Sequence, residues 1–90
     1  MREHQLKSWP PYYEDVESGR KSFELRFNGD RQFGVGDLLI LREWSPRGDF
    51  TGRSCKREVV YVLHGVGIGG IAPLHGLSVN YVILGLKVVT

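Results

Sequence analysis

The apolar positions along the chain recur mainly with the two-residue period of β-strands. Residues 23–27 alternate without a break, which places Phe23, Leu25 and Phe27 on one face and polar side chains on the other. Residues 38–41 are continuously apolar, a pattern typical of a strand covered on both sides. Further strands are predicted over 4–7, 58–63 and 81–89. The chain is therefore predicted to be mostly β.

One short segment has helical spacing instead. Tyr12 and Val16 lie four residues apart, and Gly19 follows as a C-terminal stop. Proline suits the first turn of a helix, where its missing N–H costs little. We expect a two-turn helix over 11–18, with Tyr12, Val16 and also Tyr13 facing inward.

The predicted connections contain most of the glycines. Residues 44–53 have the turn residues of a β-hairpin connection, and residues 65–76 form a glycine-rich loop broken by Pro73. Gly85 inside the last strand indicates a bulge or close packing. Glycines 65, 67 and 70 match the dinucleotide-binding fingerprint literally. That motif requires a helix to open at its end, which Pro73 excludes.

These elements predict one domain over residues 1–90, of mostly β (α+β) class with one or two short helices. Five or six strands in so short a chain favour a small, largely antiparallel β-barrel, closed or nearly closed, because closure removes exposed strand edges. A chain of this size has a thin core and room for one cleft.

The cysteine content and the hydropathy of the chain indicate the cellular compartment in which it works. Cys55 is the single cysteine, so no intramolecular disulfide can form, although small extracellular domains often need one. The first residues resemble no signal peptide, and no apolar stretch approaches the roughly 20 residues of a membrane span. We expect a cytoplasmic protein that is monomeric and binds no membrane.

Charge concentrates in the first two-thirds of the chain. Every acidic residue, and every basic residue except Lys87, precedes Tyr61. The densest polar pattern is at Lys21, Glu24 and Arg26, where the predicted strand follows the helix. This pattern alone favours a surface ion pair that contributes about 0–1 kcal/mol. The alternative is a polar cleft.

A resemblance to a known family favours the cleft. The pattern Gly19-x-Lys21-x-x-Glu24-x-Arg26 resembles the signature of the ASCH domain family of the PUA-like superfamily. Further matches to one small subfamily without assigned function are His4-x-Leu6-Lys7, Phe33-x-Val35-Gly36-Asp37, Phe50-Thr51-Gly52-Arg53 and Arg57-Glu58-Val59. The resemblance covers nearly the whole chain and implies a PUA-like small barrel.

Members of that superfamily mostly bind RNA, so the resemblance implies an RNA- or nucleotide-binding cleft lined by Lys21, Glu24 and Arg26. Lysine supplies a point charge for phosphate, and arginine offers a planar fork for pairing or stacking. We expect His4 and Lys7 to extend the cleft wall. Single-stranded RNA is often read by aromatic stacking, for which four side chains are candidates. They are Trp9, Tyr12, Tyr13 and Trp44, with Trp9 favoured because it lies beside two prolines.

A small hydrolase acting on a modified nucleoside or RNA is the alternative function. Some ASCH relatives resemble amidohydrolases or ribonucleases, and the amidohydrolase arrangement has a threonine at the position of Glu24. Glu24 is a candidate general base here, with Lys21 or Arg26 stabilising charge. Non-catalytic binding is the favoured interpretation, and no cofactor is expected.

Two further possibilities concern other side chains. His4, His64 and His75 with Cys55 match no zinc spacing, so no metal is expected. The basic residues of segment 44–57 form a candidate basic patch for nucleic acid, or a surface that binds a partner protein. These cations are Arg47, Arg53, Lys56 and Arg57.

Overall fold

The computed structural model describes residues 1–68, 72–74 and 76–89. The principal elements are β1 (Glu3–Ser8), α1 (Pro10–Glu17), β2 (Phe23–Phe27), β3 (Leu38–Trp44), β4 (Phe50–His64) and β7 (Tyr81–Val88). The two short strands β5 (Val66–Ile68) and β6 (Ala72–Leu74) form a separate pair. The prediction of a mostly β, α+β fold is confirmed.

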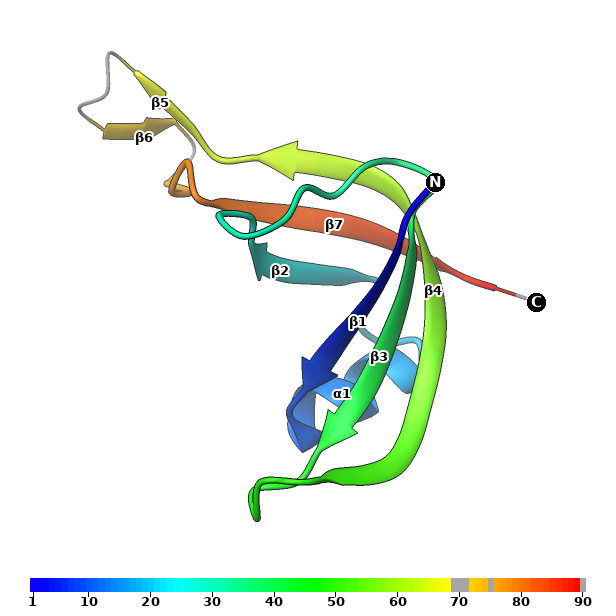
Figure 1. Cartoon of the computed structure of the whole chain (residues 1–90). Coiled ribbons are helices and arrows are strands. Elements are labelled where there is room, and N and C mark those ends of the chain that lie inside the picture. Colours follow the sequence, from blue (N-terminus) through cyan, green and yellow to red (C-terminus); the bar gives the residue numbers. More distant parts are fainter. Residues whose placement is uncertain (69–71, 75, 90) are drawn as a thin grey trace.

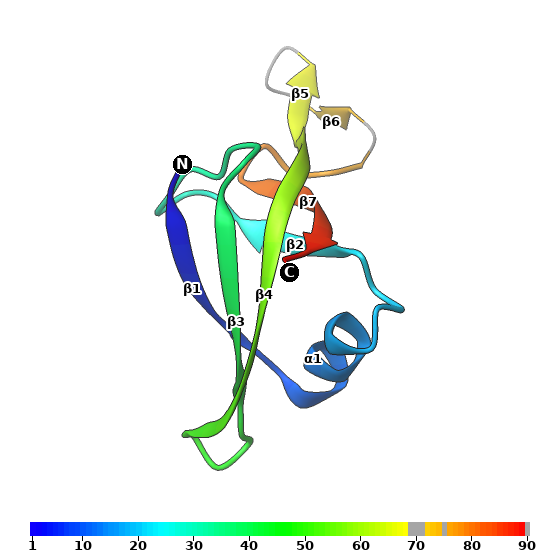
Figure 2. The ribbon, with the colours of Figure 1, turned by 90° about the vertical axis from the view of Figure 1, so that its right-hand side faces the viewer.

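Five strands form one strongly curled sheet in the order β1-β3-β4-β7-β2 (Figures 1 and 2). All pairings are antiparallel except that of β1 with β3. The sheet forms a half-barrel rather than the nearly closed barrel expected, because β1 and β2 are its two edges. A hydrogen bond from Arg26 Nη2 to the Lys7 carbonyl, 2.9 Å long, spans these edges.

The core lies on the inner, concave face of the sheet. Leu39, Leu41, Val59 and Leu84 are fully buried there, and Val16 packs against them from α1. Burial of side chains of this size contributes about 1.5–3 kcal/mol each. The helix therefore covers one end of the half-barrel.

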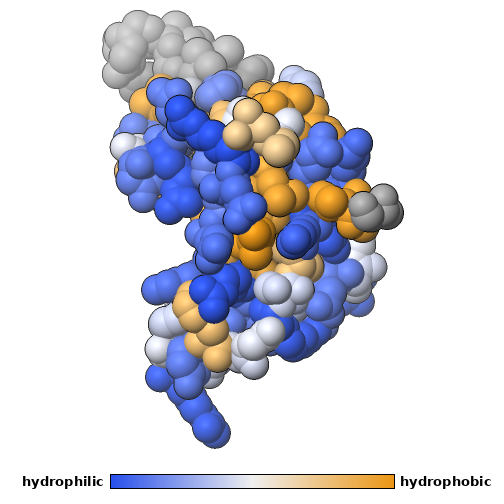
Figure 3. Space-filling view, turned by 45° about the vertical axis from the view of Figure 1, so that its right-hand side comes forward, coloured by the Kyte–Doolittle hydropathy of each residue, from blue (hydrophilic) through white to orange (hydrophobic). Residues whose placement is uncertain are grey.

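Apolar side chains are exposed outside the core as well. Figure 3 shows hydrophobic residues beside the C-terminal end of β7, where Val88 and Val89 are exposed. The strand β2 shows this most clearly: Phe23, Leu25 and Phe27 are 46–52% exposed. The predicted alternation of β2 is confirmed, with its polar side chains on the inner side.

Several predicted boundaries were wrong in informative ways. The connection between β3 and β4 is limited to residues 45–49, since Gly48 has φ 92° and its N–H bonds to the Ser45 carbonyl. The strands consequently extend further toward this turn than predicted. The predicted glycine-rich loop over 65–76 contains the β5–β6 pair. Gly69, Gly70, Ile71 and His75 lie outside the described residues.

The prediction of close packing at Gly85 is confirmed. A Cβ on Gly85 would lie 3.1 Å from the Cβ of Tyr61, next to the point where the register between β4 and β7 shifts. The bulge itself lies in β4, between Val59 and Tyr61.

Asp37 fastens the start of β1 to the connection that precedes β3. Its carboxylate accepts hydrogen bonds from the backbone N–H groups of Arg2 and Gly34, and it lies 2.9 Å from His4 Nε2. Burial raises the pKa of Asp37, but the bonds from His4 and the two N–H groups outweigh it and leave the pKa below its usual range.

This lowered pKa predicts a contribution to acid unfolding. A carboxyl group with a lower pKa in the folded state stabilises above its unfolded pKa, about 3.9, and loses that contribution as pH falls through the folded pKa. We expect Asp37→Asn to lower the free energy of unfolding by about 1–3 kcal/mol at pH 7. The deficit should shrink below about pH 4 in urea titrations at several pH values. A deficit independent of pH would contradict this role.

Candidate functional site

A pocket of about 930 Å³ opens where the two sheet edges approach each other beside α1; we call it the seam pocket. Its walls come from the end of β1, the outer side of α1, the turn after α1 and the edge strand β2. The lining residues are Lys7, Ser8, Trp9, Tyr12, Asp15, Arg20, Lys21, Phe23, Glu24, Leu25 and Arg26. Five of the six residues predicted for ligand binding therefore line one pocket, and His4 does not.

The turn after α1 positions the signature lysine. Gly19 has φ 86°, a conformation that favours glycine, and its N–H bonds to the Val16 carbonyl. The chain then reverses so that the Lys21 N–H bonds to the Asp15 carbonyl at 2.8 Å. This reversal brings the Lys21 side chain to the edge of β2.

Lys21, Glu24 and Arg26 form a compact charge cluster, which we call the triad. Lys21 Nζ lies 2.6 Å from Glu24 Oε2, and Arg26 donates to Glu24 Oε1 from Nε at 3.1 Å and Nη2 at 2.7 Å. The Glu24 side chain is 3% exposed, against 18% for Lys21 and 23% for Arg26. A carboxylate this buried requires its partners, so the interpretation as a freely solvated surface pair is wrong.

The charges around the pocket favour an anion. Lys7, Arg20, Lys21 and Arg26 line it, against the carboxylates of Asp15 and Glu24. Arg20 is paired with Asp15 at 2.9 Å, and the triad holds two cations on a single carboxylate. The triad therefore carries an excess positive charge at a pocket wall.

Exposed aromatic side chains line the pocket beside the triad. Trp9 is 53% exposed and Tyr12 is 58% exposed, and the Tyr12 ring centroid lies 5.3 Å from Lys21 Nζ. The expected inward orientation of Tyr12 is wrong: α1 is turned so that its buried positions are Tyr13 and Val16, three residues apart. Tyr12 is consequently free to take part in the pocket.

Tyr13 packs inside, and it is therefore no stacking candidate. Its hydroxyl donates to Glu17 Oε2 at 2.9 Å, and burial together with this bond raises the pKa of Tyr13. Trp44 is also outside the pocket, packed edge-on against Phe50 and under the ammonium group of Lys7.

Ser8 is a pocket residue that the sequence analysis missed. It is 3% exposed, and its hydroxyl has no hydrogen-bond partner among the described residues. A buried hydroxyl without a partner costs about 1–3 kcal/mol, so it calls for an explanation. Its place at the pocket makes a ligand atom a suitable partner. The available sequence signal was its position two residues after Leu6, which places Ser8 on the same face of β1 as His4 and Leu6.

The variant Ser8→Ala tests whether the Ser8 hydroxyl binds a ligand or only supports the fold. If a ligand satisfies the hydroxyl, the variant should bind the ligand about 5- to 10-fold more weakly, the loss expected for one hydrogen bond. Its melting temperature without ligand should stay unchanged or rise, because the unpaired group is gone. Calorimetric titration and thermal melting of the same preparations measure both. A lower melting temperature with unchanged affinity would contradict a ligand-binding role.

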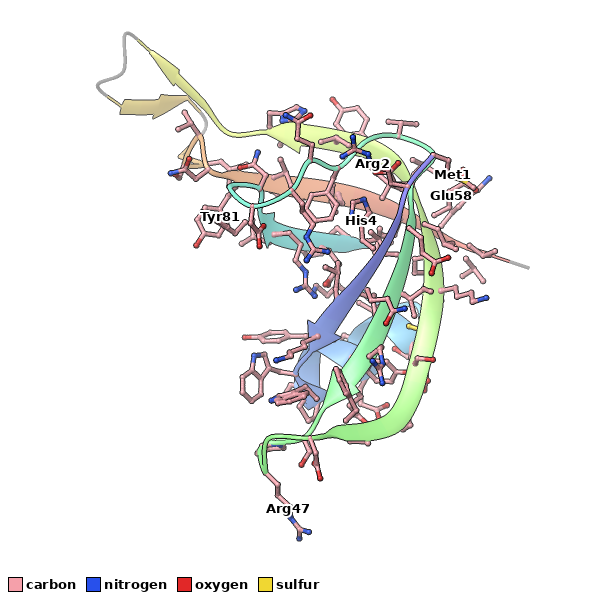
Figure 4. The ribbon with its side chains drawn as sticks, viewed as in Figure 1. Met1, Arg2, His4, Arg47, Glu58 and Tyr81 are labelled. Carbon is pink, nitrogen blue, oxygen red and sulfur yellow. The ribbon has the colours of Figure 1, made fainter. Side chains whose placement is uncertain are left out.

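His4 lies elsewhere, so its predicted place in the cleft wall is wrong. It is 6% exposed, bonded to Asp37, and its ring packs 4.6 Å from that of Phe33. Figure 4 shows it on the part of β1 nearer the N-terminus, away from the end of β1 that lines the pocket. His4 faces inward from β1, but there it contacts Asp37 and Phe33 and so serves the fold rather than the pocket.

Two of the four cations in the predicted basic patch of the hairpin, Arg53 and Arg57, form contacts within the protein. Arg53 pairs with Glu14 and Glu17 of α1, and Arg57 is buried, donating to the Val16 carbonyl at 2.8 Å. These two arginines attach α1 to β4. Arg47 points away from the molecule at the tip of the hairpin (Figure 4).

Across 1–68, 72–74 and 76–89, no group of three histidine, cysteine or acidic side chains is arranged to hold a metal ion. No helix within these ranges has the length and apolar character to cross a bilayer.

Comparisons with known proteins give a family and one curated relative. The model of the family described as "Domain of unknown function (DUF3850)" matches residues 3–86. The relative is an uncharacterized 12.9 kDa protein, in the GpA 3′ region, of Escherichia phage P2. It is 39% identical over 59 residues, which are 66% of this chain and 52% of the phage protein. The match thus spans about half the length of that relative.

Proposed function

The chain belongs to the DUF3850 family, and we propose that it binds RNA or a nucleotide in the seam pocket. One observation carries this proposal: a buried carboxylate holds two partly exposed cations against the wall of a pocket that exposed aromatic rings also line. Phosphate and base are the two chemical parts of a nucleotide, and this pocket offers a complement to each.

The contacts support a role for each of these pocket residues in the proposed function. Lys21 and Arg26 engage phosphate, and Trp9 or Tyr12 stacks on a base. Glu24 holds the two cations in place, because each of its oxygens already accepts a charge-assisted hydrogen bond. The resemblance to ASCH domains of the PUA-like superfamily points the same way. We place this activity in the cytoplasm, with a monomer as the binding unit.

The test is RNA binding by the wild type and by Lys21→Ala/Arg26→Ala across a salt series. We expect the variant to lose at least about tenfold in affinity, and its affinity to depend less steeply on salt. Arg47→Ala/Lys56→Ala is the matched control, since it removes the same charge from exposed positions outside the pocket. Equal losses in both variants would contradict the proposed site.

Stability must be followed in the same experiment, because the two cations also neutralise Glu24. Circular dichroism and thermal melting show whether the double variant is folded. Lys21→Gln is milder because Arg26 stays on the carboxylate. If this folded variant and the wild type bind RNA and mononucleotides equally, Lys21 takes no part in binding.

A hydrolase acting on a modified nucleoside or RNA is the second candidate. The observation that favours it is the close pair of Lys21 Nζ and Glu24 Oε2, 2.6 Å apart at a pocket wall. A carboxylate beside an ammonium group can position and deprotonate water if a ligand displaces the lysine. Mass spectrometry of modified nucleosides before and after incubation tests for turnover. Glu24→Gln should abolish that turnover while the fold is retained.

A further inference from the structure

Two cations on the outer face of the sheet are held over aromatic rings. Lys7 of β1 and Arg42 of β3 are partners in register, and each points outward because its neighbours along the strand are buried on the inner face. Lys7 Nζ lies 4.0 Å from the centroid of the Trp44 ring, and the guanidinium carbon of Arg42 lies 3.6 Å from that of Phe50. The two rings pack edge-on with centroids 4.8 Å apart. We call these four side chains the cation stack.

Both cations of the stack keep their hydrogen-bond donors unused. Within residues 1–68, 72–74 and 76–89, neither the Lys7 ammonium nor the Arg42 guanidinium forms an ion pair or a hydrogen bond. An aromatic face attracts a cation but offers no lone pair, so it fixes the side chain and leaves the N–H groups available. Fixing a long side chain in advance lowers the entropy lost when a ligand binds. The stack therefore presents two preorganised positive charges without a negative partner.

The cation stack adjoins the seam pocket through Lys7. Lys7 is one of the residues that line the pocket, whereas Arg42, Trp44 and Phe50 are not. Neighbouring strands lie about 4.8 Å apart, so Arg42 is one strand further from the pocket than Lys7. A chain of phosphates that leaves the pocket across the end of β1 therefore meets Lys7 first and Arg42 next.

We propose that the cation stack binds the phosphate backbone of a single-stranded RNA that places one nucleotide in the seam pocket. This inference rests on the proposed function and narrows its ligand from a free nucleotide to an RNA strand. Phosphate suits the stack because arginine forks and lysine point charges both recognise it. A single strand suits the pocket because its bases are unpaired and accessible. Backbone contacts carry no sequence information, so the stack contributes affinity and the pocket any preference for a base.

The test compares Arg42→Gln with the wild type on two probes: nucleoside 5′-monophosphates, and a single-stranded RNA heptamer that contains all four bases. Arg42 does not line the pocket, so the fold and the affinity for the monophosphates should be retained. The heptamer should bind about three- to tenfold more weakly at low salt. The slope of log affinity against log salt concentration should fall by about 0.7, as expected for one phosphate contact on a single strand. Arg42→Lys keeps the charge and should keep the slope.

Arg47→Gln is the matched control, because it removes the same charge from the tip of the hairpin, away from the pocket (Figure 4). It should bind both probes as the wild type does. If Arg42→Gln binds the heptamer normally, or if Arg47→Gln loses as much affinity, the role of the stack is overturned while the pocket remains. Equal losses for both probes in Arg42→Gln also overturn it, since they indicate an effect on the fold.

The wild type alone tests the choice of ligand. It should bind the heptamer more tightly than any monophosphate, because the strand reaches both the pocket and the stack. Equal affinities would overturn the strand proposal and leave the pocket as a nucleotide site. A heptapeptide of glutamate that binds as tightly as the RNA heptamer would overturn the choice of RNA in favour of an acidic protein segment. Failure to bind either nucleotide probe overturns the proposed function as well.

Discussion

Glu24→Ala is expected to destabilise the fold strongly, by about 2–4 kcal/mol. The change leaves Lys21 and Arg26 facing each other at a pocket wall without the carboxylate that both contact. Breaking a buried ion pair from one side costs about 3–5 kcal/mol. The smaller value applies because the two cations keep about a fifth of their surface in water, where their charge is partly solvated. Urea unfolding at neutral pH measures the loss.

The triple variant Lys21→Met/Glu24→Leu/Arg26→Met distinguishes a structural triad from a binding triad. Replacing a whole charged cluster by apolar side chains of similar volume is often neutral or stabilising. We expect the triple variant to recover most of the stability that Glu24→Ala loses, and to bind no RNA. Recovery of stability with RNA affinity intact would show that the triad serves the fold alone.

Gly65→Ala is expected to destabilise by about 3 kcal/mol or more. Gly65 is buried between β4 and β5, and a Cβ at this position would lie 1.7 Å from the carbonyl oxygen of Ser78 and 2.4 Å from its carbonyl carbon. Both are backbone atoms, so relief requires movement of the main chain before β7. The hydrogen bond from the Gly65 N–H to the Tyr81 carbonyl, 3.0 Å long, would be strained as well.

Gly34→Ala provides the control for this effect. A Cβ on Gly34 would meet its nearest atoms, the carboxylate oxygens of Asp37, at 3.9 Å, an ordinary contact distance. Its melting temperature should stay within a few degrees of the wild type, whereas that of Gly65→Ala should fall by about 12 °C or more. Similar melting temperatures for the two variants would contradict the packing at Gly65.

The positions of the strands could be predicted from the sequence because period-two alternation is a local signal. Residues 23–27 form β2 with the predicted bounds, and the helix differs from its prediction by one residue at each end. The ends of β3 and β4 were harder to predict. The turn residues of 44–53 describe a hairpin, but only the backbone hydrogen bonds of Ser45 and Gly48 decide how short its turn is.

The candidate site was partly predictable in the same sense. The spacing of Lys21, Glu24 and Arg26 alone favoured a surface ion pair, and the resemblance to ASCH domains favoured a cleft. The structure brings the three side chains into contact. His4 and Tyr12 were misplaced because their orientation depends on distant partners. Asp37, 33 residues further along the chain, holds His4, and the phase of the whole helix decides whether Tyr12 or Tyr13 is buried.

The sequence by itself determined that β2 has one polar and one apolar face. Only the tertiary structure decided which face lies inside, and the inner face is the polar one. Apolar side chains normally turn inward because their burial is favourable. Here β2 is the edge strand of a curled sheet, and its inner side meets the end of β1 and the turn after α1, where Lys21 and Arg26 neutralise Glu24. That assembly of segments distant in sequence creates the seam pocket and leaves Phe23, Leu25 and Phe27 exposed outside.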